Sequence, residues 1–153
     1  MINIKKIAVF SILILLTSCG YTPLLNSNNS DFYIGNLTLN GDRQINNYIS
    51  TNLKKYKNKK ENAKIYDIEI TSEYVKNITN KDNSGNPKNY NITTKVNIKI
   101  LSDGVAEKIR DLKRSFSFSA QNKKITENQI ESDNKKNLSK LLAQDIIFLL
   151  RNQ

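Results

Sequence analysis

Hydrophobic and polar residues alternate most regularly in the middle of the chain. From residue 92 to residue 100 every second position is apolar or β-branched, and polar or basic residues stand between them. Residues 64–71 show the same alternation earlier in the chain. A period of two is typical of a strand with one buried face and one face in water. We therefore predict two strands, joined by a turn over residues 80–88, where Gly85 and Pro87 interrupt regular structure.

Two further segments are predicted to be strands. Residues 32–39 (FYIGNLTL) are rich in β-branched and aromatic residues, which favour extended structure. After a turn at residues 102–104, Leu112, Phe116 and Phe118 share one face, and Ser and Lys residues occupy the other. Four strands are therefore expected in all.

Two segments have the period of an α-helix. Asp42 is a suitable N-cap for a helix from about Arg43 to Lys57. Thr126 and Gln129 have the spacing of a capping box, which predicts a long helix from there to about Asn152. The expected buried stripe of this last helix comprises Ile130, Leu138, Leu141, Leu142, Ile146, Leu149 and Leu150.

The predicted order of elements is β-α-β-β-β-α, which defines an α+β fold class. Two helices on one face of a mostly antiparallel four-stranded sheet, a two-layer sandwich, is the simplest arrangement that buries these stripes. One domain is expected over residues 31–153. In its core we expect Val96, Ile98, Phe116, Leu141 and Ile146 to be well buried.

The N-terminus has the pattern of a lipoprotein signal peptide over residues 1–18. Lys5 and Lys6 precede an apolar stretch at residues 7–16, which is too short to span a bilayer. Residues 16–19 (LTSC) then resemble a bacterial lipobox, and its Cys19 is the one cysteine of the chain. The resemblance implies that Cys19 receives a diacylglyceryl group on sulfur and an acyl chain, such as palmitate, on its amine after cleavage. Residues 19–30 then form a lipidated, flexible tether.

Composition excludes several kinds of site. The chain has 153 residues, no His and one Cys. An internal disulfide, a Cys/His zinc site and His-dependent catalysis are therefore excluded. We expect no metal, no cofactor and no enzymatic activity. The formal charge is +10, but the basic run at residues 54–60 is interpreted as a solvated helix end. No nucleic-acid partner is expected, because an exported protein does not meet one.

Several of these features together resemble the lipopolysaccharide-assembly lipoproteins (the LptE family), particularly their short alphaproteobacterial type. The start CGYTPL at residues 19–24 is similar to the start common in that family. The order of elements is also similar, from the first strand and helix to a leucine-rich C-terminal helix. Within it, the resemblance rests on Arg43, Gln44, Leu53, Tyr90, Arg114 and Phe116.

The resemblance implies a non-enzymatic role at the outer membrane. A protein of this family plugs and helps assemble a large β-barrel translocon of the LptD type, and it contacts lipopolysaccharide on its way to the outer leaflet. Gly20 after the cysteine favours transport to the outer membrane, where the protein would be anchored and face the periplasm. The alternative is an auxiliary or scaffold lipoprotein of another envelope complex, either a lipid transporter or a peptidoglycan-associated assembly.

The candidate lipopolysaccharide contacts are four lysines. Lys81 and Lys88 flank the predicted turn between the two alternating strands, and Lys123 and Lys124 lie in the connection to the last helix. In an antiparallel arrangement these two connections meet at one end of the sheet. The four cations are therefore expected to converge on one anionic head group.

Overall fold

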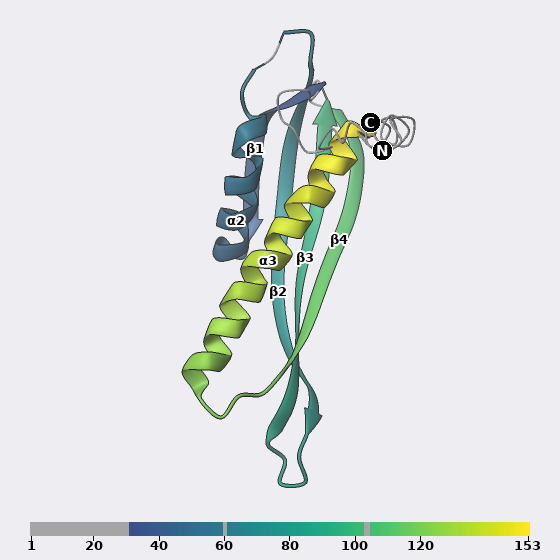
Figure 1. Cartoon of the computed structure of the whole chain (residues 1–153). Helices are drawn as coiled ribbons and strands as arrows, with labels where there is room; N and C mark the ends of the chain where they lie inside the picture. The colour runs from purple at the N-terminus through teal and green to yellow at the C-terminus, as the bar shows by residue number, and fades with distance from the viewer. Residues whose placement is uncertain (1–30, 60, 103–104) are drawn as a thin grey trace, which may run out of the picture.

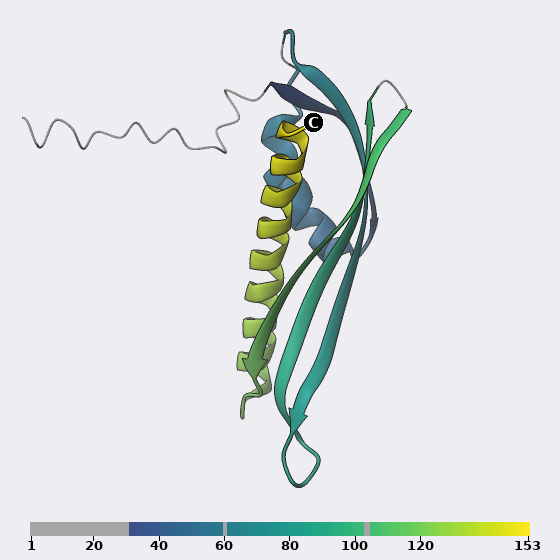
Figure 2. The same ribbon diagram turned by 90° about the vertical axis from the view of Figure 1, so that its right-hand side faces the viewer.

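The protein consists of one sheet layer and one helix layer, seen edge-on in Figure 2 and face-on in Figure 1. The computed structural model describes residues 31–59, 61–102 and 105–153. Its elements are β1 (Phe32–Gly41), α2 (Arg43–Leu53), the 3₁₀ helix η2 (Lys54–Tyr56), β2 (Lys64–Lys81), β3 (Pro87–Ser102), β4 (Val105–Ser119) and α3 (Lys124–Arg151). The predicted α+β sandwich with both helices on one face is confirmed.

The four strands follow one another across the sheet in the order β1-β2-β3-β4. β2, β3 and β4 form antiparallel pairs. β1 lies parallel to β2, because α2 crosses over between them and brings the chain back to the end where β1 began. The sheet is therefore mixed, and both its first and its last strand are edge strands.

The turn from β1 into α2 depends on Gly41 and Asp42. Gly41 has φ = +94°, and a Cβ atom at this position would lie 1.9 Å from the carbonyl oxygen of Ser72. Glycine is thus required twice, by the backbone conformation and by the close approach of β2. Asp42 is the predicted N-cap: its Oδ1 accepts hydrogen bonds from the backbone N–H groups of Gln44 and Ile45, both at 2.9 Å.

α2 ends four residues earlier than its predicted end at Lys57. The chain tightens into η2 after Leu53, and this 3₁₀ turn directs Tyr56 into the core. Tyr56 is 1% exposed, and its ring stacks on that of Phe32 with centroids 5.5 Å apart. The stacked pair closes the core at the end of the sheet where β1 begins.

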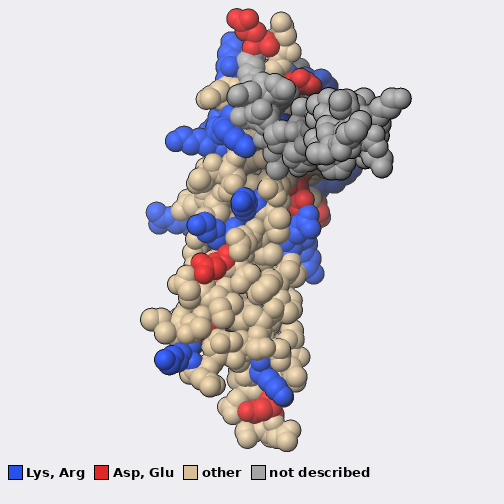
Figure 3. All heavy atoms as spheres, in the orientation of Figure 1, with Lys and Arg blue, Asp and Glu red and all other residues tan. Residues whose placement is uncertain are grey.

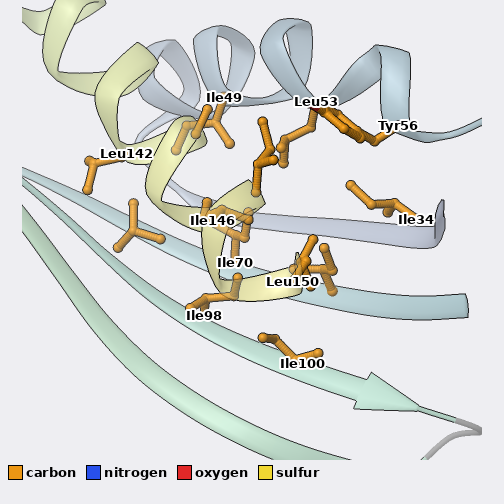
Figure 4. Packing of buried hydrophobic residues seen from close by; sticks show 14 of the residues in the cluster. Ile34, Ile49, Leu53, Tyr56, Ile70, Ile98, Ile100, Leu142, Ile146 and Leu150 are labelled. Atoms are coloured by element: carbon orange, nitrogen blue, oxygen red, sulfur yellow. The ribbon is translucent and has the colours of Figure 1, made fainter. Parts of the chain in front are cut away.

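Most of the buried side chains belong to one cluster between the sheet and the two helices (Figure 4). Ile70 of β2, Ile98 of β3, Ile49 of α2 and Ile146 of α3 all contribute to it. The predicted burial of Val96, Ile98 and Ile146 is confirmed. A smaller cluster of Ile92, Phe118 and Leu138 lies nearer the start of α3.

The predicted burial of Phe116 and Leu141 is wrong. Phe116 is 39% exposed and Leu141 is 43% exposed. Phe116 is on the predicted face of β4, but β4 is the last strand of the sheet, so no neighbour covers that face from the outer side. Leu141 is on the flank of α3 that passes this edge. The predicted face of β4 is right, but the predicted burial is wrong, because a side chain on an edge strand has a neighbouring strand on one side only.

The predicted capping box of α3 is also wrong. The helix begins at Lys124 after Lys123, and Lys123 makes no side-chain cap. The carbonyl oxygen of Lys123 accepts the backbone N–H groups of Thr126 and Glu127, so Thr126 already lies inside the first turn. Gln129 donates to Asp133 instead of reaching back to the start of the helix.

Candidate functional site

Four lysines mark one end of the molecule, the lower end in Figure 1, which we call the cationic end: Lys81, Lys88, Lys123 and Lys124. All four are exposed. The β2–β3 hairpin and the connection from β4 to α3 do meet there, since Asn89 pairs with Ser119 and the backbone N–H of Ala120 donates to the carbonyl of Lys88 at 2.9 Å. On the face of the molecule that Figure 3 shows, the basic side chains at this end stand in separate groups.

Asp82 fixes the hairpin that presents two of these lysines. Its carboxylate accepts hydrogen bonds from the backbone N–H groups of Ser84 and Asn86 and from the Asn86 side chain, at 2.9, 2.8 and 3.1 Å. The bonds from Asn86 are the main reason that the pKa of Asp82 lies below its usual value. Gly85 completes the turn with φ = +85°. Lys81 and Lys88 are therefore held on either side of a closed, ordered loop.

The four lysines are not equivalent. Lys124 forms an ion pair with Glu127, whereas Lys81, Lys88 and Lys123 form no ion pair with any residue among those that the structure describes. Glu127 is itself 3% exposed. The cations available to an anionic ligand at the cationic end are thus Lys81, Lys88 and Lys123.

Behind the cationic end lies a charged network centred on Lys76 of β2. Its Nζ atom is 2.7 Å from Glu131 and 3.3 Å from Glu127, both of which project from α3. The Tyr74 hydroxyl donates to Glu131 at 2.7 Å. Lys76 also lies 4.2 Å from the centre of the Tyr90 ring, a cation–π distance. The network joins the first turns of α3 to the middle of the sheet.

The pKa values of these groups reflect their mutual contacts. The hydrogen bond from Lys124 is the main cause that lowers the pKa of Glu127. Burial acts to raise the pKa of Glu131, but the hydrogen bonds from Lys76 and Tyr74 outweigh it and the pKa is lowered. Burial and the bond to Glu131 raise the pKa of Tyr74. Both carboxylates are therefore held in their charged form.

A second ion pair ties α3 to the start of α2. Lys135 is 9% exposed, and its Nζ lies 2.9 Å from Oδ2 of Asp42, the N-cap of α2. The same Nζ lies 4.3 Å from the centre of the Tyr74 ring. Burial alone would raise the pKa of Asp42. The backbone hydrogen bond from Ile45 and the contacts of Lys135 outweigh this effect, so the pKa lies below its usual value. One carboxylate thus caps a helix and anchors a second one.

The sheet face opposite the helices carries polar pairs across its strands. Lys99 contacts Glu69 at 3.2 Å and Lys95 contacts Glu73 at 3.1 Å. Nearer the hairpin, the hydroxyls of Thr93 and Ser115 share a hydrogen bond of 2.9 Å. Exposed pairs of this kind contribute little stability each. What they define is a long surface that is polar and nearly balanced in charge.

The sequence predicts that the four lysines share one end of the sheet, which the structure shows, but sequence reasoning missed the network behind them. The signal was present: Tyr74 and Lys76 continue the alternation of Ile68 and Ile70, so they share the helix-facing side of β2. Cys19, the leader and the tether lie outside the described residues. None of the helices that the structure describes is long and apolar enough to cross a membrane. Within the same residues no group of His, Cys, Asp and Glu could hold a metal ion.

The fold is shared with solved structures of lipoproteins. The chain is similar to rare lipoprotein B from Shewanella oneidensis, with a TM-score of 0.60 and 11% identity over 75% of this chain and 92% of that one. It is also similar to a minor lipoprotein from Acinetobacter baumannii, with a TM-score of 0.55 and 18% identity over 76% and 90% of the two chains. A lipoprotein B from Nitrosomonas europaea gives a TM-score of 0.57 and 14% identity over 78% and 83%.

No family model matches the chain, and no curated protein matches its sequence. At identities of 11–18% the structural likeness establishes the fold. The domain therefore has the two-layer α+β fold of proteins that are described as lipoproteins, and the match covers 83–92% of each of their chains.

Proposed function

We propose that this protein is an outer-membrane lipoprotein, anchored through Cys19, that serves in lipopolysaccharide transport as the plug of a β-barrel translocon of the LptD type. One coincidence carries the proposal: a lipobox ends at the one cysteine of the chain, and the domain that follows has the fold of solved lipoproteins. The two observations are independent, because the described domain begins at residue 31.

The shape and surface of the domain support a plug. The lumen of an outer-membrane barrel is polar, and the open sheet face presents paired charges and hydroxyls instead of an apolar surface. The ion pairs behind the cationic end hold α3 firmly on the sheet. A plug with these properties would fill a wet lumen and help shape the barrel around it without catalysing a reaction.

The cationic end is where we place contact with lipopolysaccharide. Lysine binds phosphate as a point charge, through charge-assisted hydrogen bonds. Lys81, Lys88 and Lys123 are exposed and lie at the same end of the sheet. Lys124 would join them only by giving up its contact with Glu127, so its contribution is expected to be the smallest of the four.

Purification of the native protein in mild detergent tests the function. Co-isolation of a large outer-membrane β-barrel in stoichiometric amount is the expected result. Co-isolation of an inner-membrane transporter or of cell-wall fragments would instead establish the alternative, a lipoprotein of another envelope complex. The intact mass of the same preparation should show an acylated Cys19 as the first residue. An unmodified Cys19 would contradict the proposal that the protein is anchored by lipid at this residue.

Reversing the three available charges of the cationic end should weaken lipopolysaccharide binding. In the variant with Lys81, Lys88 and Lys123 all replaced by Glu, we expect about a tenfold loss of affinity at low salt, because each exposed contact contributes less than about 1 kcal/mol. The loss should shrink as salt is added, since about 0.15 M salt screens exposed charges beyond about 8 Å. Adding Lys124→Glu should change affinity little further.

A matched variant separates position from charge. Lys54, Lys57 and Lys59 lie at the opposite end of the domain, and replacing these three by Glu changes the net charge by the same amount. This control should bind as the parent does, and both variants should keep the parent's unfolding temperature. Equal losses in the two variants, or no loss in the first, would place lipopolysaccharide contact elsewhere.

A further inference from the structure

The outer edge of β4 presents backbone groups that no strand satisfies. Residues of an antiparallel pair alternately exchange both backbone hydrogen bonds with their partner and direct both groups away from it. Ala120 bonds to Lys88, and the register from Asn89↔Ser119 back to Ile100↔Lys108 is unbroken. Even-numbered positions of β4 from 108 to 118 therefore bond to β3, and the odd-numbered positions 109–117 direct their N–H and C=O groups outward.

One side-chain contact agrees with this assignment. The Arg110 guanidinium donates from Nη1 to the carbonyl of Ile109 at 2.9 Å, which shows that this odd-numbered carbonyl is open to a donor from outside the ladder. At the end of the strand, Gln121 likewise donates from Nε2 to the carbonyl of Ser119 at 2.8 Å. Within the described residues no further hydrogen bond reaches the outer edge of β4 between these two carbonyls. The edge is thus a row of donors and acceptors at the spacing of a strand.

An apolar groove runs beside this edge, between β4 and α3; we call it the β4–α3 seam and define it by Leu112, Phe116, Leu141 and Phe148. Its exposed aromatic residues are Phe116 at 39% and Phe148 at 65%. A cavity of about 300 Å³ opens in the part of the seam near Leu112 and Phe148. Its lining is mixed: Leu112, Phe148 and Leu149 are apolar, and Asp111, Lys113, Arg114 and Asp145 are charged. Phe116 and Leu141 are not part of this lining.

An ion pair bridges the middle of the seam. Arg114 donates to both carboxylate oxygens of Asp145, at 2.8 and 2.6 Å. Leu141 lies one helical turn before Asp145, and Phe148 lies about one turn after it. The bidentate pair therefore holds α3 at a fixed distance from β4 and leaves an apolar surface on each side.

The charges along the edge select for an acidic partner. Residues 108–116 contain four basic side chains and one acidic one. Lys108, Arg110 and Arg114 stand on the seam side of β4, where Arg114 is already bound to Asp145, and Lys113 and Asp111 stand on the open side. The edge therefore keeps a net positive charge. A second copy of this chain that added through the same edge would bring two such basic stretches together, which is unfavourable. An extended segment with carboxylates would be attracted instead.

We propose that the outer edge of β4 and the β4–α3 seam together bind an extended segment of a partner polypeptide as a fifth strand. The segment alternates apolar and acidic residues. Its apolar side chains lie in the seam against Leu112, Phe116 and Phe148. Its acidic side chains lie on the open face of the sheet, where one of them meets Lys113, and the net positive charge of the edge attracts the segment as a whole. Strand addition of this kind takes affinity from the main chain and specificity from every second side chain. This site is separate from the cationic end and does not depend on lipopolysaccharide.

Amide-resolved hydrogen exchange of the full-length protein in mild detergent tests the proposal. The probe is a blocked peptide in which valine and glutamate alternate over about eight residues. Exchange should slow at least severalfold at the outward amides of Ile109, Asp111, Lys113 and Ser115. The even-numbered amides between them are already bonded to β3 and should change little. A peptide that alternates valine and lysine should protect none of these amides.

Two variants make the test specific. Lys113→Pro removes one outward N–H without touching the bonds to β3 and should weaken the peptide about fivefold, the value of one net hydrogen bond. Lys113→Ala keeps that N–H and should bind more tightly than the proline variant. If the proline variant does not fold, Phe148→Asn takes its place, because this exposed ring is outside both core clusters.

Three outcomes would overturn the proposal. The first is no alternating protection at millimolar peptide. The second is equal protection by the lysine peptide, which would show that the site does not select an acidic segment. The third is protection of the same amides by the protein's own self-association without peptide, which would make the occupant a second copy.

Discussion

Ile98→Ala is expected to lower the free energy of unfolding by about 2–5 kcal/mol, the range for truncating a large aliphatic side chain in a packed core. Ile98 is fully buried. It pairs with Ile70 on β2 and lies beneath α3 in the main cluster (Figure 4). Both helices and the sheet contribute to that cluster, so the cavity left by the lost methyl groups cannot be filled by the movement of one element. Denaturant titration of the protein measures the change.

Ile109→Ala is the matched control, because it makes the same substitution on the neighbouring strand. Ile109 is 56% exposed, and its replacement should cost less than about 1 kcal/mol. A cost below about 1 kcal/mol for Ile98→Ala as well would mean that the inward and outward faces of β3 are exchanged. A loss of about 2–5 kcal/mol for both variants would contradict the exposure of Ile109 on the open face of the sheet.

Lys76→Met is expected to cost about 2–3 kcal/mol, because it leaves the Glu131 carboxylate without its ion-pair partner and close to the Glu127 carboxylate, which keeps only Lys124. Glu127 is almost fully buried, and the side chains of Lys76 and Glu131 are 23% and 25% exposed. Methionine keeps the length of the aliphatic chain, so the loss reports the charge and not the packing. Adding Glu127→Gln and Glu131→Gln to Lys76→Met should recover much of the stability.

The effect of Lys76→Met should depend on pH in a defined direction. The pKa values of Glu127 and Glu131 are lowered in the folded protein from an ordinary value of 4.5. Their contribution to stability is therefore complete above about pH 4.5 and is lost as the pH falls through the lowered values. The difference between the parent and Lys76→Met should accordingly shrink in acid. Lys99→Met breaks an exposed pair with Glu69 and should cost less than about 1 kcal/mol at neutral pH.

The amino-acid sequence was sufficient to predict the strands whose one face packs against the helices and whose other face is in water. β2 and β3 are central strands, so their period of two translates directly into burial at Ile70 and Ile98. The same reasoning failed at Phe116 and Leu141, where burial depends on what lies beyond the edge of the sheet. It failed at Thr126 because the helix there starts without a side-chain cap.

The position of the candidate site was predictable from the sequence, but the ion pairs between β2 and α3 were not. That Lys81, Lys88, Lys123 and Lys124 share one end follows from antiparallel topology alone. The pair of Lys124 and Glu127 is local, because the two residues are three positions apart in α3. That Lys76 is engaged by Glu127 and Glu131 depends instead on how α3 is rotated over the sheet. Separations of some fifty residues along the chain between these partners leave no local pattern to read.

The parallel pairing of β1 with β2 sets the reach of the molecule. It places Phe32 beside Lys64, so the chain enters the domain at the end of β2 opposite the cationic end. The 18 residues of β2 extend over about 55 Å at about 3.3 Å per residue. This length exceeds the 40–45 Å thickness of a bilayer with its head groups. A protein held by Cys19 at one leaflet could therefore deliver its free lysines to the level of the other leaflet while its anchor stays in place.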